Sequence, residues 1–224
     1  MRKTLIVVLV VALGTTLACG KEEAGSRAAI ERDLKERSIR DLYEEAEKIA
    51  YTPPADELLT DAHLERYLRV RGLAREITKV AEERLDDQLQ RASHDENPFT
   101  RMGTAFAGFG NARNMLTADV RAALMLDENP HELFWVSSQI DKASGTYITR
   151  RDYEKRVAEK AAAFDNETDS ILRDRRRREW ESERDRQRMW LNGLSDVALA
   201  NSKIVEANRL ALAPYHKQLA KKRQ

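Results

Sequence analysis

The sequence has a single cysteine, Cys19, among its 224 residues. Because there is no second thiol, the chain forms no internal disulfide, and the Cys-x-x-Cys spacing of structural zinc sites is excluded. The four histidines are far apart, and none lies one helical turn from another, so the paired-histidine spacing of catalytic zinc is missing as well. We therefore expect no metal and no other cofactor.

Signatures of catalysis are equally scarce. The sequence contains no phosphate-binding glycine loop, no nucleophile elbow and no alternation of strand and helix patterns. His94-Asp95-Glu96 is a dense polar trio, but it lies in a predicted break between helices, where a solvated loop is the better interpretation. Carboxylates are so numerous that no pair of them stands out as an acid and a base. The sequence predicts that the protein is not an enzyme.

Residues that break helices are also few, with nine glycines and five prolines, and aromatic residues make up only 6% of the chain. Charged residues make up 34%, above the roughly 25% of an average globular chain. Few breakers together with abundant Ala, Leu, Glu, Arg and Lys are typical of long, surface-exposed helices. The composition predicts an all-α fold, an elongated helical bundle of about five to six helices.

The first twenty residues differ in character from the rest of the chain. Arg2 and Lys3 precede an unbroken apolar run over residues 5–13, and small residues follow it. This order of positive, apolar and small residues is that of a secretory signal peptide, and the run is shorter than the about 18–20 residues of a membrane-spanning helix. We expect residues 1–18 to be a cleaved signal peptide, with an uncleaved anchor helix as the alternative.

Cys19 follows this segment directly, after Leu17-Ala18 and before Gly20. These residues resemble the lipobox of bacterial lipoproteins, with Thr16 at the position where that motif usually has Leu. The resemblance implies that the Cys19 sulfur carries a diacylglycerol and that the new amine is acylated, with fatty acids such as palmitate. Because Gly20 stands where Asp would favour retention, it also implies the outer membrane of a diderm bacterium, facing the periplasm. An ordinary signal peptide with an incidental cysteine is the alternative.

We expect residues 19–26 to comprise the lipidated cysteine and a short polar tether. Residues 27–224 predict a single α-helical domain, because apolar side chains recur at three- and four-residue steps through most of it. The first helix should run from a cap at Ser26 to Tyr51, before two prolines. A second helix should start at Asp56 or Thr60 and end near Ala92. Its apolar seam comprises Leu59, Tyr67, Val70, Ala74, Ile77, Val80 or Ala81, Leu85 and Leu89.

The best-defined helix start in the remaining sequence is Asn129-Pro130-His131-Glu132. Asn129 suits the N-cap, Pro130 suits the first helical position, and Glu132 can complete a capping box. Gly145 should weaken or bend the helix that follows. Ser195 is a candidate cap for the last helix.

Phenylalanine and methionine recur at helical spacing between residues 99 and 109, beside three glycines and several small residues. The pattern has two interpretations: core packing at a close helix crossing, or the wall of a pocket for an apolar or lipid ligand. Core packing is the more frequent outcome of such a stripe. The candidate ligand wall comprises Phe99, Met102, Phe106 and Phe109.

The most polar stretch is 173–188, with eight arginines and five acidic residues. One-turn pairs such as Arg175 with Glu179 and Arg177 with Glu181 predict a solvated helix that neutralises itself. The alternative is an anion- or glycan-binding surface. Its candidate residues are Arg175, Arg176, Arg177 and Arg178.

The net charge of the mature chain indicates which classes of partner to expect. Removal of Arg2 and Lys3 with the signal peptide leaves 37 of the 39 basic residues against 38 acidic ones, so a role through overall charge is not indicated and no nucleic acid is expected. The sequence predicts a membrane-anchored envelope lipoprotein of the interaction or scaffold type, with an envelope protein as its partner. A periplasmic binding module for an apolar ligand is the first alternative, and an anion-binding protein the second.

Overall fold

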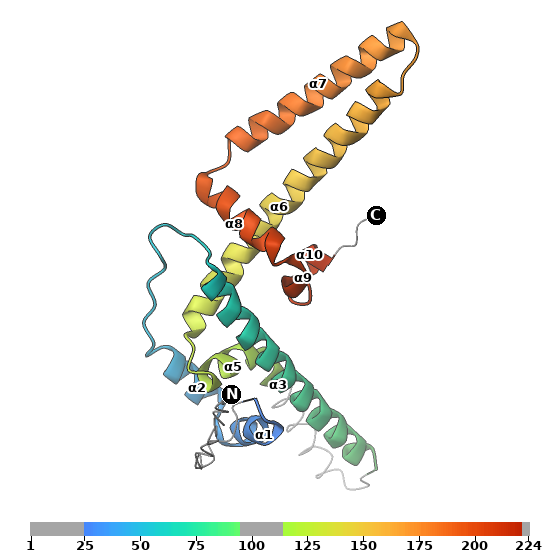
Figure 1. Cartoon of the computed structure of the whole chain (residues 1–224). Helices are drawn as coiled ribbons and strands as arrows, with labels where there is room; N and C mark the ends of the chain where they lie inside the picture. Colours follow the sequence, from blue (N-terminus) through green and yellow to red (C-terminus); the bar gives the residue numbers. More distant parts are fainter. Residues whose placement is uncertain (1–24, 95–113, 221–224) are drawn as a thin grey trace, which may run out of the picture.

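The computed structural model describes residues 25–94 and 114–220, and every regular element in these ranges is an α-helix (Figure 1). The predicted all-α class is therefore confirmed. The described part contains more helices than the sequence predicted, because several short ones separate the long ones. They are α1 (Arg27–Glu36), α2 (Ile39–Ala46), α3 (Asp61–His94), α5 (Ala118–Met125), α6 (Pro130–Asp165), α7 (Ser170–Asn192), α8 (Asp196–Ala207), α9 (Arg209–Leu212) and α10 (Lys217–Ala220).

The molecule is elongated and has two parts (Figure 1). In the first, which we call the body, α1 and α5 lie beside α3, α2 packs on α5, and the beginning of α6 packs on α3. In the second, the rest of α6 and α7 form an antiparallel hairpin that projects away from the body. We call residues 150–192 of this hairpin the arm. Helix α8 returns along α6, and α9 and α10 follow it.

The core of the body lies between α3, α5 and α6. Tyr67, Val70 and Ile77 of the predicted α3 seam are at most 2% exposed, which confirms that part of the prediction. They share a cluster with Val136 and Ile140 of α6. By contrast, the seam position Leu89 is 55% exposed. The seam is thus buried in its first part only, where α5 and α6 cover α3.

The first predicted helix is interrupted, and the interruption has a local and a distant cause. Ser38 caps α2 through a capping box with Asp41, and Arg37 before it takes an extended conformation. The carbonyl of Arg37 accepts a 2.9 Å hydrogen bond from the guanidinium of Arg121 on α5. That carbonyl therefore needs no helical partner, and the chain turns between α1 and α2. The Ser26 cap of α1 is confirmed, since its hydroxyl accepts from the Ala29 N–H.

Arg121 also forms a buried ion pair that joins α5 to α1. Its guanidinium lies 2.6 Å from the Asp33 carboxylate, and the two side chains are 1% and 8% exposed. Further hydrogen bonds run to the carbonyl of Asp33 and to the side chain of Asn114. A charge this deeply buried needs partners, because an unpaired buried ion is strongly destabilising. Both terminal nitrogens of the guanidinium have them, whereas its Nε has none among the described residues. The pair fixes how α1 and α5 meet.

Helix α6 begins as predicted, with Asn129 accepting from the His131 N–H at 2.9 Å and Pro130 in the first position. The predicted capping-box role of Glu132 is replaced by an ion pair, because its carboxylate accepts from Arg66 Nε at 3.1 Å. Helix α6 also runs unbroken through Gly145, where weakening was predicted. A Cβ at Gly145 would meet nothing within 4 Å, so neither packing nor a turn requires the glycine. The predicted cap at Ser195 is confirmed at the start of α8.

Candidate functional site

The described surface has a polar hollow where the C-terminal segment meets α3 and α6. Its volume is about 420 Å³. We call it the His216 hollow. All of its lining residues carry a polar or charged group: Tyr67, Arg71, Ser137, Asp141, Tyr215, His216, Lys217 and Gln218.

A chain of hydrogen bonds runs along one wall of this hollow. His216 Nδ1 lies 2.9 Å from Asp141 Oδ1, and His216 Nε2 lies 2.8 Å from the Tyr67 hydroxyl. Because a carboxylate can only accept, Nδ1 carries the proton, and in the neutral imidazole Nε2 is then the acceptor for the Tyr67 O–H. Tyr67 is 2% and His216 6% exposed. Residues from α3, α6 and the segment before α10 are thus joined through one imidazole.

The order carboxylate, imidazole, hydroxyl is that of a nucleophilic triad, but its last member differs in chemistry. Burial raises the pKa of the Tyr67 phenol above its ordinary value of 10.0. The phenol therefore stays protonated near neutral pH and acts as a donor to His216. In this state the three side chains brace the C-terminal segment against α3 and α6, and they leave the second oxygen of Asp141 open.

Arg71 lies between the His216 hollow and two further hollows. Its Nη1 pairs with Asp119, and its Cζ lies 5.5 Å from the centre of the Tyr215 ring. Its Nε is buried and has no hydrogen-bond partner. The second hollow, of about 410 Å³, extends from Arg71 toward Arg75 and Thr78. The third is smaller, about 110 Å³, and is mainly apolar; Val120, Leu133 and Phe134 line it with Arg71.

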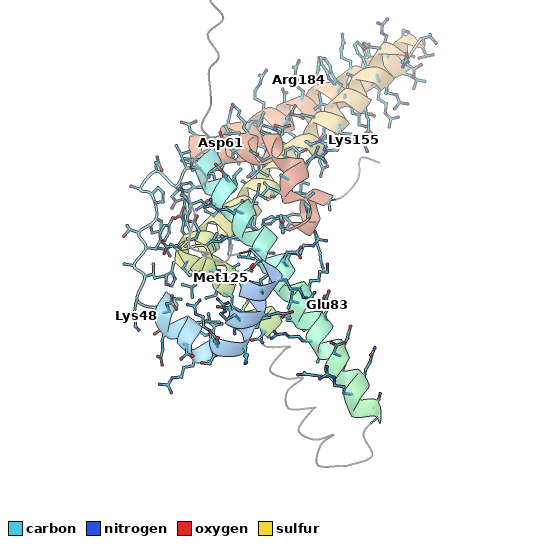
Figure 2. The ribbon with its side chains drawn as sticks, turned by 60° about the horizontal axis from the view of Figure 1, so that its bottom comes forward. Lys48, Asp61, Glu83, Met125, Lys155 and Arg184 are labelled. Carbon is cyan, nitrogen blue, oxygen red and sulfur yellow. The ribbon has the colours of Figure 1, made fainter. Side chains whose placement is uncertain are left out.

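The arm is held together by an aromatic ladder along its seam. Tyr153 of α6 packs on Trp190 of α7 with ring centres 5.5 Å apart, and Phe164 stacks on Trp180 at 6.2 Å. Such pairs add about 0.5–1.5 kcal/mol beyond the area they bury. In Figure 2 side chains radiate from both helices of the arm, where Lys155 and Arg184 are labelled. The arm is thus a two-helix unit with a narrow seam.

Ion pairs bridge the two helices beside this ladder. Arg156 Nε lies 2.8 Å from Glu183, and Lys160 Nζ lies 3.1 Å from Glu179. The hydrogen bond from Arg156 lowers the pKa of Glu183 below its ordinary value of 4.5. The Glu183 carboxylate is the most enclosed group of α7. Electrostatics therefore reinforce a seam that offers little apolar area.

Arg175, Arg176, Arg177 and Arg178 all lie exposed on α7, near the far end of the arm. The predicted pair of Arg175 with Glu179 is present at 3.3 Å. Arg177 pairs with Asp174 at 3.0 Å and not with Glu181 as predicted, and Arg176 lies 4.0 Å from Glu167. Within the described residues Arg178 has no charged partner. Most of the arginine charge is thus compensated locally, as expected for a solvated helix.

The turn at the tip of the arm exposes two aliphatic side chains. Asp169 caps α7 by accepting from the N–H groups of Ile171 and Leu172, both at 2.9 Å. The side chains of these residues point outward, with Ile171 79% and Leu172 47% exposed. Because the cap fixes the backbone, this apolar pair is held in a defined position.

Five candidate residues from the sequence lie outside the described ranges: Cys19, Phe99, Met102, Phe106 and Phe109. The lipid anchor and the apolar ligand wall therefore stay predictions. Among residues 25–94 and 114–220, no group of three His, Cys, Asp or Glu side chains is arranged to hold a metal ion. Over the same ranges, no helix combines the length and apolarity needed to cross a bilayer.

Sequence reasoning missed the His216 hollow. His216 and Tyr67 are 149 positions apart, and Asp141 lies 75 positions from His216. No motif spacing links residues so distant. The one available signal was Tyr67, a phenol placed on an otherwise aliphatic seam, where its hydroxyl needs a partner in the core.

The sequence matches no family model, and no curated protein or solved structure is found to be similar to it.

Proposed function

We propose that this chain is a non-enzymatic envelope lipoprotein of the interaction or scaffold type, tethered through Cys19, and that the tip of the arm contacts its protein partner. The observation that carries the proposal is the separation of arm and body. None of the described residues that form the core cluster lies between 150 and 192. The arm therefore does not serve to cover the core of the body.

The physical features of the tip support this role. The aromatic ladder and its ion pairs hold α6 and α7 together in the arm and so support the turn at its tip. What the arm adds to the surface is a capped turn with Ile171 and Leu172 exposed. Exposed apolar side chains on a capped turn are suited to fill a pocket on a partner, because the backbone of the turn loses little freedom on binding.

The arrangement also suits a tethered protein. The first described residue, Gly25, lies next to α1, and α1 and the arm are at opposite ends of the molecule (Figure 1). A fully extended tether from Cys19 to Gly25 spans at most about 20 Å, whereas a helix of the length of α6 spans about 54 Å. If Cys19 is lipidated, the arm can reach partners well outside the anchoring bilayer.

The arm is tested by crosslinking in intact cells. A photoreactive amino acid in place of Leu172 should yield a crosslinked protein of defined size. The double substitution Ile171→Ser and Leu172→Ser should abolish co-purification of that protein and leave the melting temperature unchanged. Leu210→Ser is the matched control, because Leu210 on α9 is an equally exposed aliphatic residue, 80% exposed. Equal recovery with wild type and the double variant would refute the proposal.

The anchor is tested separately by metabolic labelling with a fatty acid. Wild-type protein should carry the label and sediment with membranes, and Cys19→Ser should do neither. Equal label in both proteins would reject the lipid anchor and leave the role of the arm open, because the arm is tested by an independent readout.

A further inference from the structure

The geometry points to a second function in the body: the His216 hollow binds a small zwitterion, an amino acid or a short peptide with free termini. Its volume of about 420 Å³ lies within the roughly 300–1,000 Å³ range of small-molecule sites. Each of its lining residues contributes a polar or charged group, which favours a polar solute over an acyl chain.

The first reason for a zwitterion is an open negative group. Both hydrogen bonds to the Asp141 side chain, from His216 and from Gln218, end on Oδ1. Oδ2 has no partner among the described residues, and the side chain is 58% exposed. The brace from His216 holds this carboxylate in place, since the imidazole itself is buried. Oδ2 can therefore accept from an ammonium group at the mouth of the hollow.

The second reason is that the same hollow has positively charged groups with unused hydrogen-bond donors. Lys217 lines it and pairs with no carboxylate in the described part of the chain. Arg71 is engaged by Asp119 through Nη1 only, and its Nη2 has no partner in the described part. The Tyr215 ring beside the guanidinium limits the orientations that Arg71 can take. Lys217 and Arg71 can receive a carboxylate, an anion that both ammonium and guanidinium groups bind by charge-assisted hydrogen bonds.

The third reason is that the negative pole of the hollow, Asp141, does not pair with its positive pole, Lys217 and Arg71. No ion pair joins Lys217 or Arg71 to Asp141, although all three line one hollow. The hydroxyl of Ser137 belongs to the same lining and offers a further polar contact to a ligand. A ligand with one positive and one negative end satisfies both poles at once, whereas a simple anion satisfies only one.

Titration of the full-length protein with matched probes tests the assignment. Glycine and triglycine carry both charges, acetate carries only the carboxylate, and methylammonium carries only the cation. We expect saturable binding of glycine or triglycine by ligand-observed NMR. We expect acetate and methylammonium to bind at least about tenfold more weakly, the factor for one charge-assisted hydrogen bond. The ratio of glycine to triglycine affinity shows whether the ligand is an amino acid or a peptide.

Two variants address the two poles. Asp141→Asn keeps an acceptor for His216 and removes the negative charge, so it should weaken zwitterion binding about tenfold and leave acetate binding unchanged or stronger. Lys217→Met should weaken both acetate and zwitterion binding. Lys203→Met, an exposed lysine on α8 outside the hollow, is the control. Absence of saturable zwitterion binding to wild type overturns the proposal. Acetate binding as tight as glycine binding, or zwitterion binding that neither pole variant weakens, overturns it as well.

Discussion

Removal of Asp33 should be among the most damaging single substitutions in the body. Asp33→Ala leaves the Arg121 guanidinium 1% exposed with only neutral acceptors around it. Arginine cannot shed its proton to escape the burial, because the guanidinium stays protonated in proteins. Breaking a buried ion pair in this way costs about 3–5 kcal/mol. For a chain of this length that corresponds to a melting temperature lower by about 6–20 °C.

Removal of the other partner should cost less. In Arg121→Met the Asp33 carboxylate keeps a second cation, because Arg37 lies 3.2 Å from it and is 28% exposed. We therefore expect a loss near the lower end of the same range, about 3 kcal/mol. The double variant Asp33→Leu with Arg121→Met should recover much of the loss, since it removes both charges and fills the space with apolar groups.

Urea unfolding followed by circular dichroism measures these differences. Arg40→Ala is the control, because its ion pair with Glu44 lies on the surface with side chains 85% and 50% exposed, and such pairs contribute about 0–1 kcal/mol. If Asp33→Ala costs no more than Arg40→Ala, the buried pair does not hold α1 against α5. If the double variant is as unstable as Asp33→Ala, the loss does not come from an uncompensated charge.

Three further outcomes are expected. Arg176→Glu with Arg177→Glu should change the free energy of unfolding by less than about 1 kcal/mol, because both side chains are exposed; unchanged binding to anionic vesicles would then reject the anion-binding alternative. The arm should loosen in acid, since the Glu183 carboxylate, whose folded pKa is lowered by Arg156, contributes stability above its ordinary pKa of 4.5 and loses it as the pH falls through the folded pKa; tryptophan fluorescence should show this transition, and Glu183→Gln should reduce it. Gly145→Ala should stabilise α6 by about 0.5–1 kcal/mol in thermal unfolding, because an added Cβ meets nothing within 4 Å.

Features specified by neighbouring residues could be predicted from the sequence. The caps at Ser26, Asn129 and Ser195 are local hydrogen bonds, and each is where the sequence placed it. The α3 seam at Tyr67 and Val70 follows from helical periodicity, which needs no knowledge of the partner helix. These signals sufficed for the fold class.

Features that depend on distant residues could not be predicted. The break before α2 is supported by Arg121, a residue 84 positions beyond the carbonyl it binds. A single arginine in a helical pattern is usually a surface residue, so the sequence did not predict that Arg121 is buried. The His216 hollow has the same origin, because its three braced side chains come from three separate segments. The spacing of the histidines excludes metal motifs, but it does not indicate whether a single histidine such as His216 is buried or hydrogen-bonded.

The body and the arm use charge in opposite ways, and this bears on how the protein can respond to a partner. In the body, Arg121 and His216 are buried and each satisfies several groups, so a few interactions fix one arrangement. In the arm, ion pairs such as Arg156–Glu183 flank a thin aromatic seam, and many of the charges are solvent-exposed. Weak exposed contacts are individually replaceable and are screened by salt. The exposed charges of the arm can therefore change partners when a protein binds at the tip, while the Asp169 cap keeps the turn in place and the buried network keeps the body, and the hollow in it, unchanged.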